Sequence, residues 1–240
     1  MRSAIVKLAA TVPGPAAKAK GIHGRVTQRR GPPEPQPGVF AAPPEGSPAY
    51  NRSVATVEPT REELARREAA LARVRRYGDP VLRSAARPVA AVDAAIVAQI
   101  RTMARLLEDA GEAGLAAPQL GILNRVFVYR PEPEARPDGS PGHWPVLALV
   151  NPEVEWASED TAVEEEGCLS IPGVWIPVER PAAVRMRGLD ATGRPVQVEA
   201  EEPLSRLLQH ELDHLDGVLT LDRAAKADRR AAMRALRRAR

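Results

Sequence analysis

One stretch of the chain spaces its apolar residues at the helical interval, and an earlier stretch carries a capping box. Asp93 can cap a helix that ends near Gly111, because the apolar residues between them recur every three or four positions. Thr60 and Glu63 have the spacing of a capping box, which predicts an earlier, shorter helix that runs to about Arg73. The apolar face of the longer helix consists of Ile96, Val97, Ile100, Met103, Ala104 and Leu107.

After residue 112 the pattern changes to short apolar runs that are rich in strand-forming residues. Such runs, separated by turn residues, predict β-strands. Pro177 lies inside one run and places that strand at a sheet edge or a bulge, because proline cannot donate a ladder hydrogen bond. The turn sequence at 190–193 predicts a hairpin between the last two runs. The five runs are 125–129, 146–150, 174–178, 183–187 and 195–199.

Helices return near the end of the chain. Pro203 begins an amphipathic segment that reaches His214, and Gly217 stands just past its end, as is typical around a helix. Another helix, rich in alanine and arginine, is expected from Asp222 onward. Strands followed by a late helix, without regular βαβ alternation, indicate an α+β fold.

Residues 1–59 show neither the apolar spacing of a helix nor the alternation of a strand. They hold 10 of the 24 prolines and too little apolar surface to offset the entropy of ordering. We therefore expect a disordered Pro/Ala/Gly-rich extension. The chain then divides into this extension at 1–59, a folded domain at 60–222 and a basic C-terminal helix at 223–240.

Composition and charge exclude several classes of protein. The chain has 240 residues and a single cysteine, so no disulfide can form within it. No uncharged apolar run is long enough to cross a bilayer, and we expect neither a membrane nor a DNA partner. Residues 1–60 carry eight basic and three acidic side chains, and 223–240 carry eight and one. The ends, not the acidic middle, are therefore suited to a polyanion.

The helix at 203–214 carries a pattern with specific chemistry. His210 and His214 stand four residues apart on one face with Glu211 beside them, which is the H-E-x-x-H arrangement of metal hydrolases. Two neutral imidazoles can bind a divalent ion, which lowers the pKa of a bound water to about 7. Glu211 can take the proton of that water and later give it to the leaving nitrogen. The alternative is that both histidines are surface residues of an amphipathic helix.

A catalytic site of this type needs a third protein ligand. Asp216 and Asp222 are available downstream, where H-E-x-x-H proteases usually have it. Upstream, Cys168 lies between Gly167 and Leu169 in a turn-like setting where a thiolate could be exposed, although a lone cysteine is usually a small buried residue. The residues alone leave this choice open.

Three blocks of sequence together resemble the peptide deformylase family. They are Gly-Leu-Ala-Ala-Pro-Gln at 114–119, Glu-Gly-Cys-Leu-Ser at 166–170 and Gln-His-Glu-Leu-Asp-His at 209–214, in the family's order and suitably spaced. The segment at 77–83 also resembles the family's opening. The resemblance covers about residues 74–222. It implies a catalytic domain of small antiparallel sheets packed around a central H-E-x-x-H helix.

The resemblance also implies how the site works. Cys168, His210 and His214 would bind one divalent metal ion, Fe²⁺ first, with Zn²⁺, Ni²⁺ or Co²⁺ as replacements. A metal-bound hydroxide would attack the formyl group of an N-terminal formyl-methionine on a newly made polypeptide, with Glu211 as general base and acid. Formate and a free N-terminus would result.

The same resemblance assigns the residues around the substrate. The side chain of Gln119 and the backbone N–H of Leu169 would stabilise the oxyanion. Gly114 would leave its backbone free to dock the substrate as an added strand. Glu166 would support a metal ligand from behind. Glu112 departs from the family, which usually has glycine there; if that position needs a positive φ, glutamate is costly.

The activity implied is that of a bacterial cytoplasmic enzyme, or of an organelle enzyme if 1–59 is a transit peptide. Two other functions stay open. One is an H-E-x-x-H endopeptidase, for which Cys168 is dispensable. The other is a ribosome- or RNA-associated protein that acts through its basic ends. The latter can coexist with the deformylase and predicts weak, salt-sensitive ribosome contact through 223–240.

Overall fold

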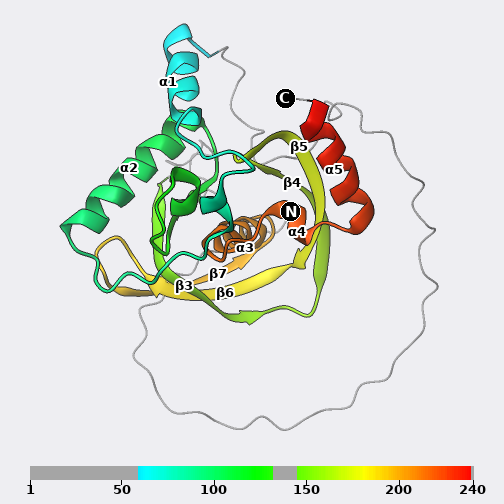
Figure 1. The fold of residues 1–240 in the computed structure, drawn as a ribbon. Coiled ribbons are helices and arrows are strands. Elements are labelled where there is room, and N and C mark those ends of the chain that lie inside the picture. The colour runs from blue at the N-terminus through cyan, green and yellow to red at the C-terminus, as the bar shows by residue number, and fades with distance from the viewer. Residues whose placement is uncertain (1–58, 132–144, 239–240) are drawn as a thin grey trace, which may run out of the picture. The chain divides into compact units, whose positions relative to one another are not determined.

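The computed structural model describes residues 59–131 and 145–238. In this part the chain combines helices with two antiparallel sheets (Figure 1). Apart from residue 59, the expected disordered extension lies outside the described residues. None of the helices in the described ranges is long and apolar enough to cross a membrane.

Two helices open the described chain, α1 (Arg61–Leu71) and α2 (Ala94–Ala110), and both were predicted from sequence. The capping box of α1 is confirmed: the Thr60 side chain accepts from the Glu63 N–H, and the Glu63 carboxylate accepts from the Thr60 N–H. Gly111 ends α2 with a φ of 68°. A short 3₁₀ turn, η1 (Pro80–Arg83), lies between the helices.

Five strands form the larger sheet in the order β1-β2-β3-β6-β7, and every neighbouring pair is antiparallel. The predicted hairpin is confirmed as β6 and β7. The short β1 lies at one edge of the sheet and leads into the 3₁₀ turn η2 (Ala117–Leu120). The strands are β1 (Gly114–Ala116), β2 (Val126–Tyr129), β3 (Leu147–Ala157), β6 (Ala183–Leu189) and β7 (Pro195–Glu201).

Strand β2 is buried on both faces, which explains its unbroken apolar sequence. Val126 and Val128 belong to the core cluster that includes the apolar face of α2. Phe127 and Tyr129 belong to a second cluster on the opposite side of the sheet. Because successive side chains of a strand point to opposite faces, the four residues of β2 contribute to a hydrophobic layer on each side of the sheet.

Two further strands, β4 (Thr161–Cys168) and β5 (Ile171–Pro181), form a separate antiparallel pair. Pro177 opposes Glu165 in this pair, so the prediction that its strand is an edge is confirmed. Strand β4 was not predicted, because it lacks an apolar run and only Glu166 among its residues is buried. Cys168 ends β4 and lies at the turn into β5.

The amphipathic helix α3 (Leu204–Leu215) contacts β1, β2, β5 and β7 (Figure 1). The single helix expected from Asp222 onward is wrong. The chain forms a short helix α4 (Thr220–Arg223) and then α5 (Lys226–Arg238), because Ala224 between them is extended. Ala232 of α5 is buried in a cluster with apolar residues of β5.

Candidate active site

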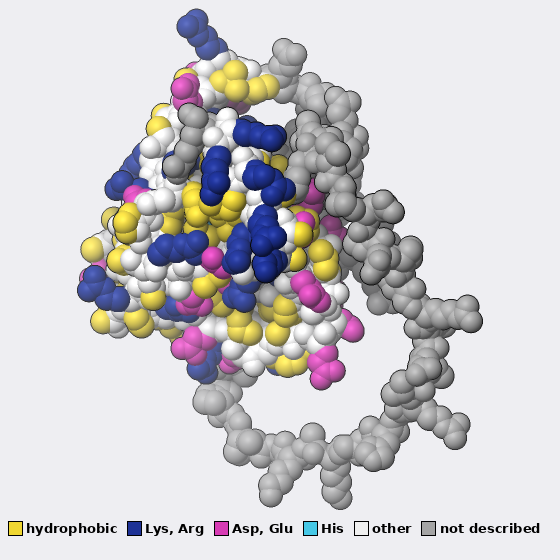
Figure 2. All heavy atoms as spheres, turned by 45° about the vertical axis from the view of Figure 1, so that its right-hand side comes forward, with side chains coloured by type: hydrophobic (Ala, Val, Ile, Leu, Met, Phe, Trp, Pro, Cys, Tyr) yellow, Lys and Arg dark blue, Asp and Glu magenta, His cyan; other side chains and the backbone are white. Residues whose placement is uncertain are grey.

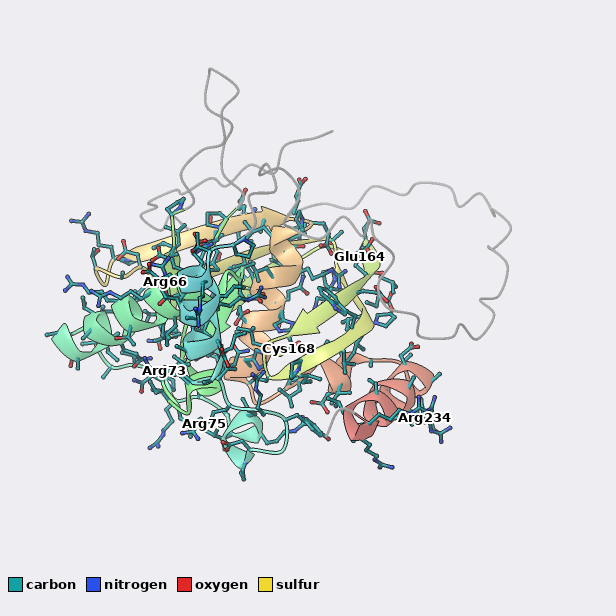
Figure 3. All side chains as sticks on the ribbon, turned by 90° about the horizontal axis from the view of Figure 1, so that it is seen from above. Arg66, Arg73, Arg75, Glu164, Cys168 and Arg234 are labelled. Atoms are coloured by element: carbon teal, nitrogen blue, oxygen red, sulfur yellow. The ribbon has the colours of Figure 1, made fainter. Side chains whose placement is uncertain are left out.

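Cys168, His210 and His214 come together in the structure. One nitrogen from each histidine and the Cys168 sulfur lie within 4.8 Å of one another. The Sγ atom of Cys168 is 3.3 Å from Nε2 of His214, although the two residues are 46 positions apart. Figure 3 shows Cys168 beside α3, which carries both histidines. The helix supplies two nitrogens from one face, and the end of β4 supplies the sulfur.

The two downstream acids that could have completed the cluster are engaged elsewhere. Arg125 Nη1 is 2.6 Å from Oδ1 of Asp216. Asp222 forms an ion pair with Arg83 and accepts the Leu219 N–H. Neither acid joins the cluster of potential ligand atoms. The geometry therefore favours the cysteine over a downstream carboxylate.

The electrostatics of the cluster suit a cation. Burial alone would raise the pKa of the Cys168 thiol, but the charges and hydrogen bonds of His214 and His210 outweigh burial and hold that pKa well below its ordinary value. The thiolate is the form of cysteine that binds metals. One thiolate and two imidazoles form a donor set that fits Fe²⁺ or Zn²⁺.

Glu166 is buried behind His210. Its Oε2 atom lies 2.9 Å from Nδ1 of His210, so the other ring nitrogen is left to face the cluster. Arg180 and Arg206 both donate to the Glu166 carboxylate, and Arg180 also donates to Asp213 at 2.9 Å. The side chains of these two arginines and two acids are each less than 10% exposed.

Neither Arg180 nor Arg206 was predicted from sequence as part of this site. A signal for Arg180 was present, because the buried residues of β5 alternate through Val174, Ile176 and Val178. Arg180 continues that alternation and so falls on the buried face. An arginine on a buried strand face needs a partner carboxylate, which here is Glu166.

Glu211 lies on α3 and is buried next to β1. Burial raises the pKa of its carboxyl to about 7, although His210 and His214 act in the opposite direction. Its Oε2 atom has no hydrogen-bond partner among the described residues. A Cβ atom on Gly114 would lie 2.3 Å from Oε1 of Glu211 and 2.8 Å from Cδ1 of Leu207. The carboxylate therefore occupies space that only glycine leaves open.

Gln119 and Leu169 flank the cluster from two different loops. The Oε1 atom of Gln119 accepts the Ala116 N–H at 2.8 Å, and its Nε2 is 3.9 Å from the Cys168 sulfur. Leu169 follows Cys168 in the β4–β5 turn, and its carbonyl accepts from Nη1 of Arg76 at 2.5 Å. The amide of Gln119 is thus oriented by the hydrogen bond that it accepts from Ala116 at the end of β1.

The strain considered for Glu112 is absent. Among the described non-glycine residues only Asn151 has a positive φ, while the neighbouring Gly111 takes the left-handed conformation. The Glu112 carboxylate instead pairs with Arg67 of α1 at 3.4 Å. Partial burial raises the pKa of Glu112, and Arg67 acts against that rise.

Comparisons with known proteins show which family the chain belongs to. A family model described as polypeptide deformylase matches residues 71–230. The peptide deformylase of Parafrankia sp. (strain EAN1pec) is 45% identical over 166 residues, which are 69% of this chain and 85% of that protein. The crystal structure of a peptide deformylase from Legionella pneumophila gives a TM-score of 0.60 at 33% identity, over 69% of this chain and 92% of that one.

A second solved structure, a peptide deformylase from Synechococcus elongatus in complex with actinonin, gives a TM-score of 0.60 at 38% identity. The match covers 68% of this chain and 84% of that chain. The chain therefore belongs to the polypeptide deformylase family, the metal-dependent hydrolases that remove the formyl group from the N-terminus of nascent polypeptides.

Proposed function

We propose that this chain releases formate from the N-terminal formyl-methionine of new polypeptides, with Glu211 as general base and acid. The position of the Glu211 carboxylate carries the proposal. It is buried on the same helix as His210 and His214, and one of its oxygens has no hydrogen-bond partner in the described chain. A carboxyl with a pKa of about 7 can both accept and donate a proton at neutral pH.

Cys168, His210 and His214 would hold the metal ion, for which Fe²⁺ is our first choice and Zn²⁺, Ni²⁺ or Co²⁺ are alternatives. When bound, the ion supplies Lewis acidity that activates water for attack on the formyl carbon. Glu166 keeps His210 in the orientation that directs one ring nitrogen to the cluster. Arg180 holds Glu166 through two hydrogen bonds and so fixes its position.

Gln119 and Leu169 would stabilise the negative charge that develops on the formyl oxygen. The Gln119 amide is held by the Ala116 N–H before substrate arrives, so little reorganisation is needed during the reaction. Glu211 would receive the proton of the attacking water and pass it to the departing nitrogen. The carbon–nitrogen bond then breaks to leave formate and a free amino group.

The substrate peptide would dock on β1. This strand pairs only with β2 within the five-stranded sheet, so its other edge is free to pair with an extended peptide. Gly114 on that strand has no side chain, and the Glu211 carboxylate occupies the space where one would begin, so a peptide paired with β1 would lie close to Glu211. The peptide backbone would then lie along β1, with its formyl end at Cys168, His210 and His214.

The test is formate release from formyl-Met-Ala-Ser by protein purified without oxygen and supplied with Fe²⁺. The Glu211→Gln variant should keep one metal ion per chain and lose about 10²-fold or more in kcat, because general acid–base catalysis typically contributes that much. Metal content measured on the same sample is the control. A Glu211→Gln enzyme with full metal and parental kcat would refute the assigned role.

We also propose a weak contact with the ribosome through residues 223–240. Arg229, Arg230, Arg234 and Arg237 border a hollow of about 530 Å³ between η1 and α5, and none has an ion-pair partner in the described chain. Basic side chains are numerous on the face shown in Figure 2. Unpaired arginines are suited to RNA phosphates.

Substitution tests the ribosome contact better than deletion of α5, since Ala232 of this helix is buried against the domain. Replacing the four unpaired arginines with glutamine should abolish co-sedimentation with ribosomes at low salt. Replacing Arg185 and Arg187, which pair with acids on the sheet, is the control and should leave co-sedimentation intact. Unchanged co-sedimentation of the fourfold variant would exclude this surface.

A further inference from the structure

The helix α1 lies almost entirely outside the family match, which begins at residue 71. It is nevertheless part of the folded domain. Ala70 is buried in the same core cluster as the apolar face of α2, and the carbonyl of Leu71 accepts from Nη2 of Arg76 at 3.4 Å. An element that the family match does not include is therefore held at a defined place next to the site.

A groove of about 420 Å³ runs along α1. Leu64 contributes apolar surface to this groove and is 52% exposed. The groove is lined by Leu64, Arg67, Glu68, Leu71, Ala72 and Arg76.

Two contacts connect the groove with the candidate active site, one on each side. Arg76 donates to the carbonyl of Leu169, the residue after Cys168. Arg67 pairs with Glu112, which stands two residues before Gly114 on the chain that leads into β1. Two lining residues of the groove therefore contact segments that flank the candidate active site.

The direction of a docked substrate follows from these positions. The formyl group must lie at the metal ligands, and Gln119, which is close to Cys168, comes after β1 in the chain. The rest of an antiparallel peptide must then run back along β1 toward Glu112. With its first residue beside Gly114 and a rise of about 3.3 Å per residue, the peptide would bring its third residue level with Glu112. Its fourth and fifth residues would continue toward α1, whose Arg67 pairs with Glu112.

We propose that α1 and Arg76 form a subsite for the fourth and fifth residues of the nascent chain, and that this subsite favours apolar side chains. The two arginines of the groove are already engaged, since Arg67 pairs with Glu112 and Arg76 donates to two carbonyl groups, and Glu68 is the third charged side chain of the lining. The apolar surface of the exposed Leu64 and the half-buried Leu71 is therefore what an apolar side chain would contact. This inference rests on the proposed function.

The test compares the peptides formyl-Met-Ala-Ser-Leu-Leu-Ser and formyl-Met-Ala-Ser-Ser-Ser-Ser on the full-length, metal-loaded enzyme. We expect kcat/KM to be about five-fold higher for the leucine peptide, the ratio expected when a leucine side chain is partly removed from water. The difference should lie in KM, because the contact is equal in the ground and transition states.

The variant Leu64→Glu should bring the ratio of the two kcat/KM values to about one, because a charge would replace the apolar surface. The matched control is Val154→Glu, a similarly exposed position on β3, which should keep the parental ratio. Equal rates on both peptides in the parent, or an unchanged ratio in Leu64→Glu, would overturn the subsite. Release of formate from neither peptide would instead refute the proposed function.

Discussion

The substitution Gly114→Ala tests the geometry of the site through a single methyl group. The added Cβ would lie 2.3 Å from Oε1 of Glu211, whereas carbon and oxygen atoms out of bonding contact stay about 3.3 Å apart. The carboxylate must therefore move by about 1 Å, and Leu207 must also shift because its Cδ1 would be 2.8 Å away. A displacement of this size in a catalytic group typically costs about 10²-fold in rate.

The assay is kcat for formate release from formyl-Met-Ala-Ser, with bound metal measured on the same protein. We expect Gly114→Ala to retain the metal, because the substitution does not touch Cys168, His210 or His214. A double-mutant cycle with Glu211→Gln shows whether the loss acts through Glu211. If it does, Gly114→Ala should cost little more once Glu211→Gln is present.

Two results would refute this reasoning. A Gly114→Ala enzyme with parental kcat would mean that the carboxylate can move without consequence. Losses that are additive in the double mutant would mean that Gly114 acts independently of Glu211, for example by admitting the substrate backbone. Unfolding in urea, measured in parallel, separates either case from a loss of stability.

Three other predictions concern the metal ligands and the buried charges. Cys168→Ala should lose bound metal and formate release together, whereas retention of both would mean that a downstream acid, and not Cys168, completes the metal site. Arg180→Met should lower the free energy of urea unfolding by about 3 kcal/mol, because it leaves buried carboxylates without their partner, while the exposed Arg187→Met control should change it far less. Burial opposes ionisation of Glu166, but hydrogen bonds from Arg180 and His210 outweigh it and lower its pKa to about 2 from an ordinary 4.5. Its contribution to stability is therefore present above pH 4.5 and lost as the pH falls toward 2, and Glu166→Gln should remove this part of the pH dependence of urea unfolding.

Local spacing was enough to predict most of the helices and several strands. The capping box at Thr60, the apolar period after Asp93 and the placing of Pro203 and Gly217 each act within one or two turns of chain. The pairing of the two histidines is also local, because residues four apart share a helix face whatever the rest of the fold does. These features depend on backbone geometry alone, so the sequence determined them.

The tertiary structure decided which distant residues meet. From sequence, the third ligand could be Cys168 or a downstream acid, and only the position of the β4–β5 pair beside α3 puts the sulfur 3.3 Å from His214. The partnership of Arg180 with Glu166 likewise depends on strand pairing. Contacts across dozens of residues depend on how sheets and helices pack, and no spacing along the chain reports that packing.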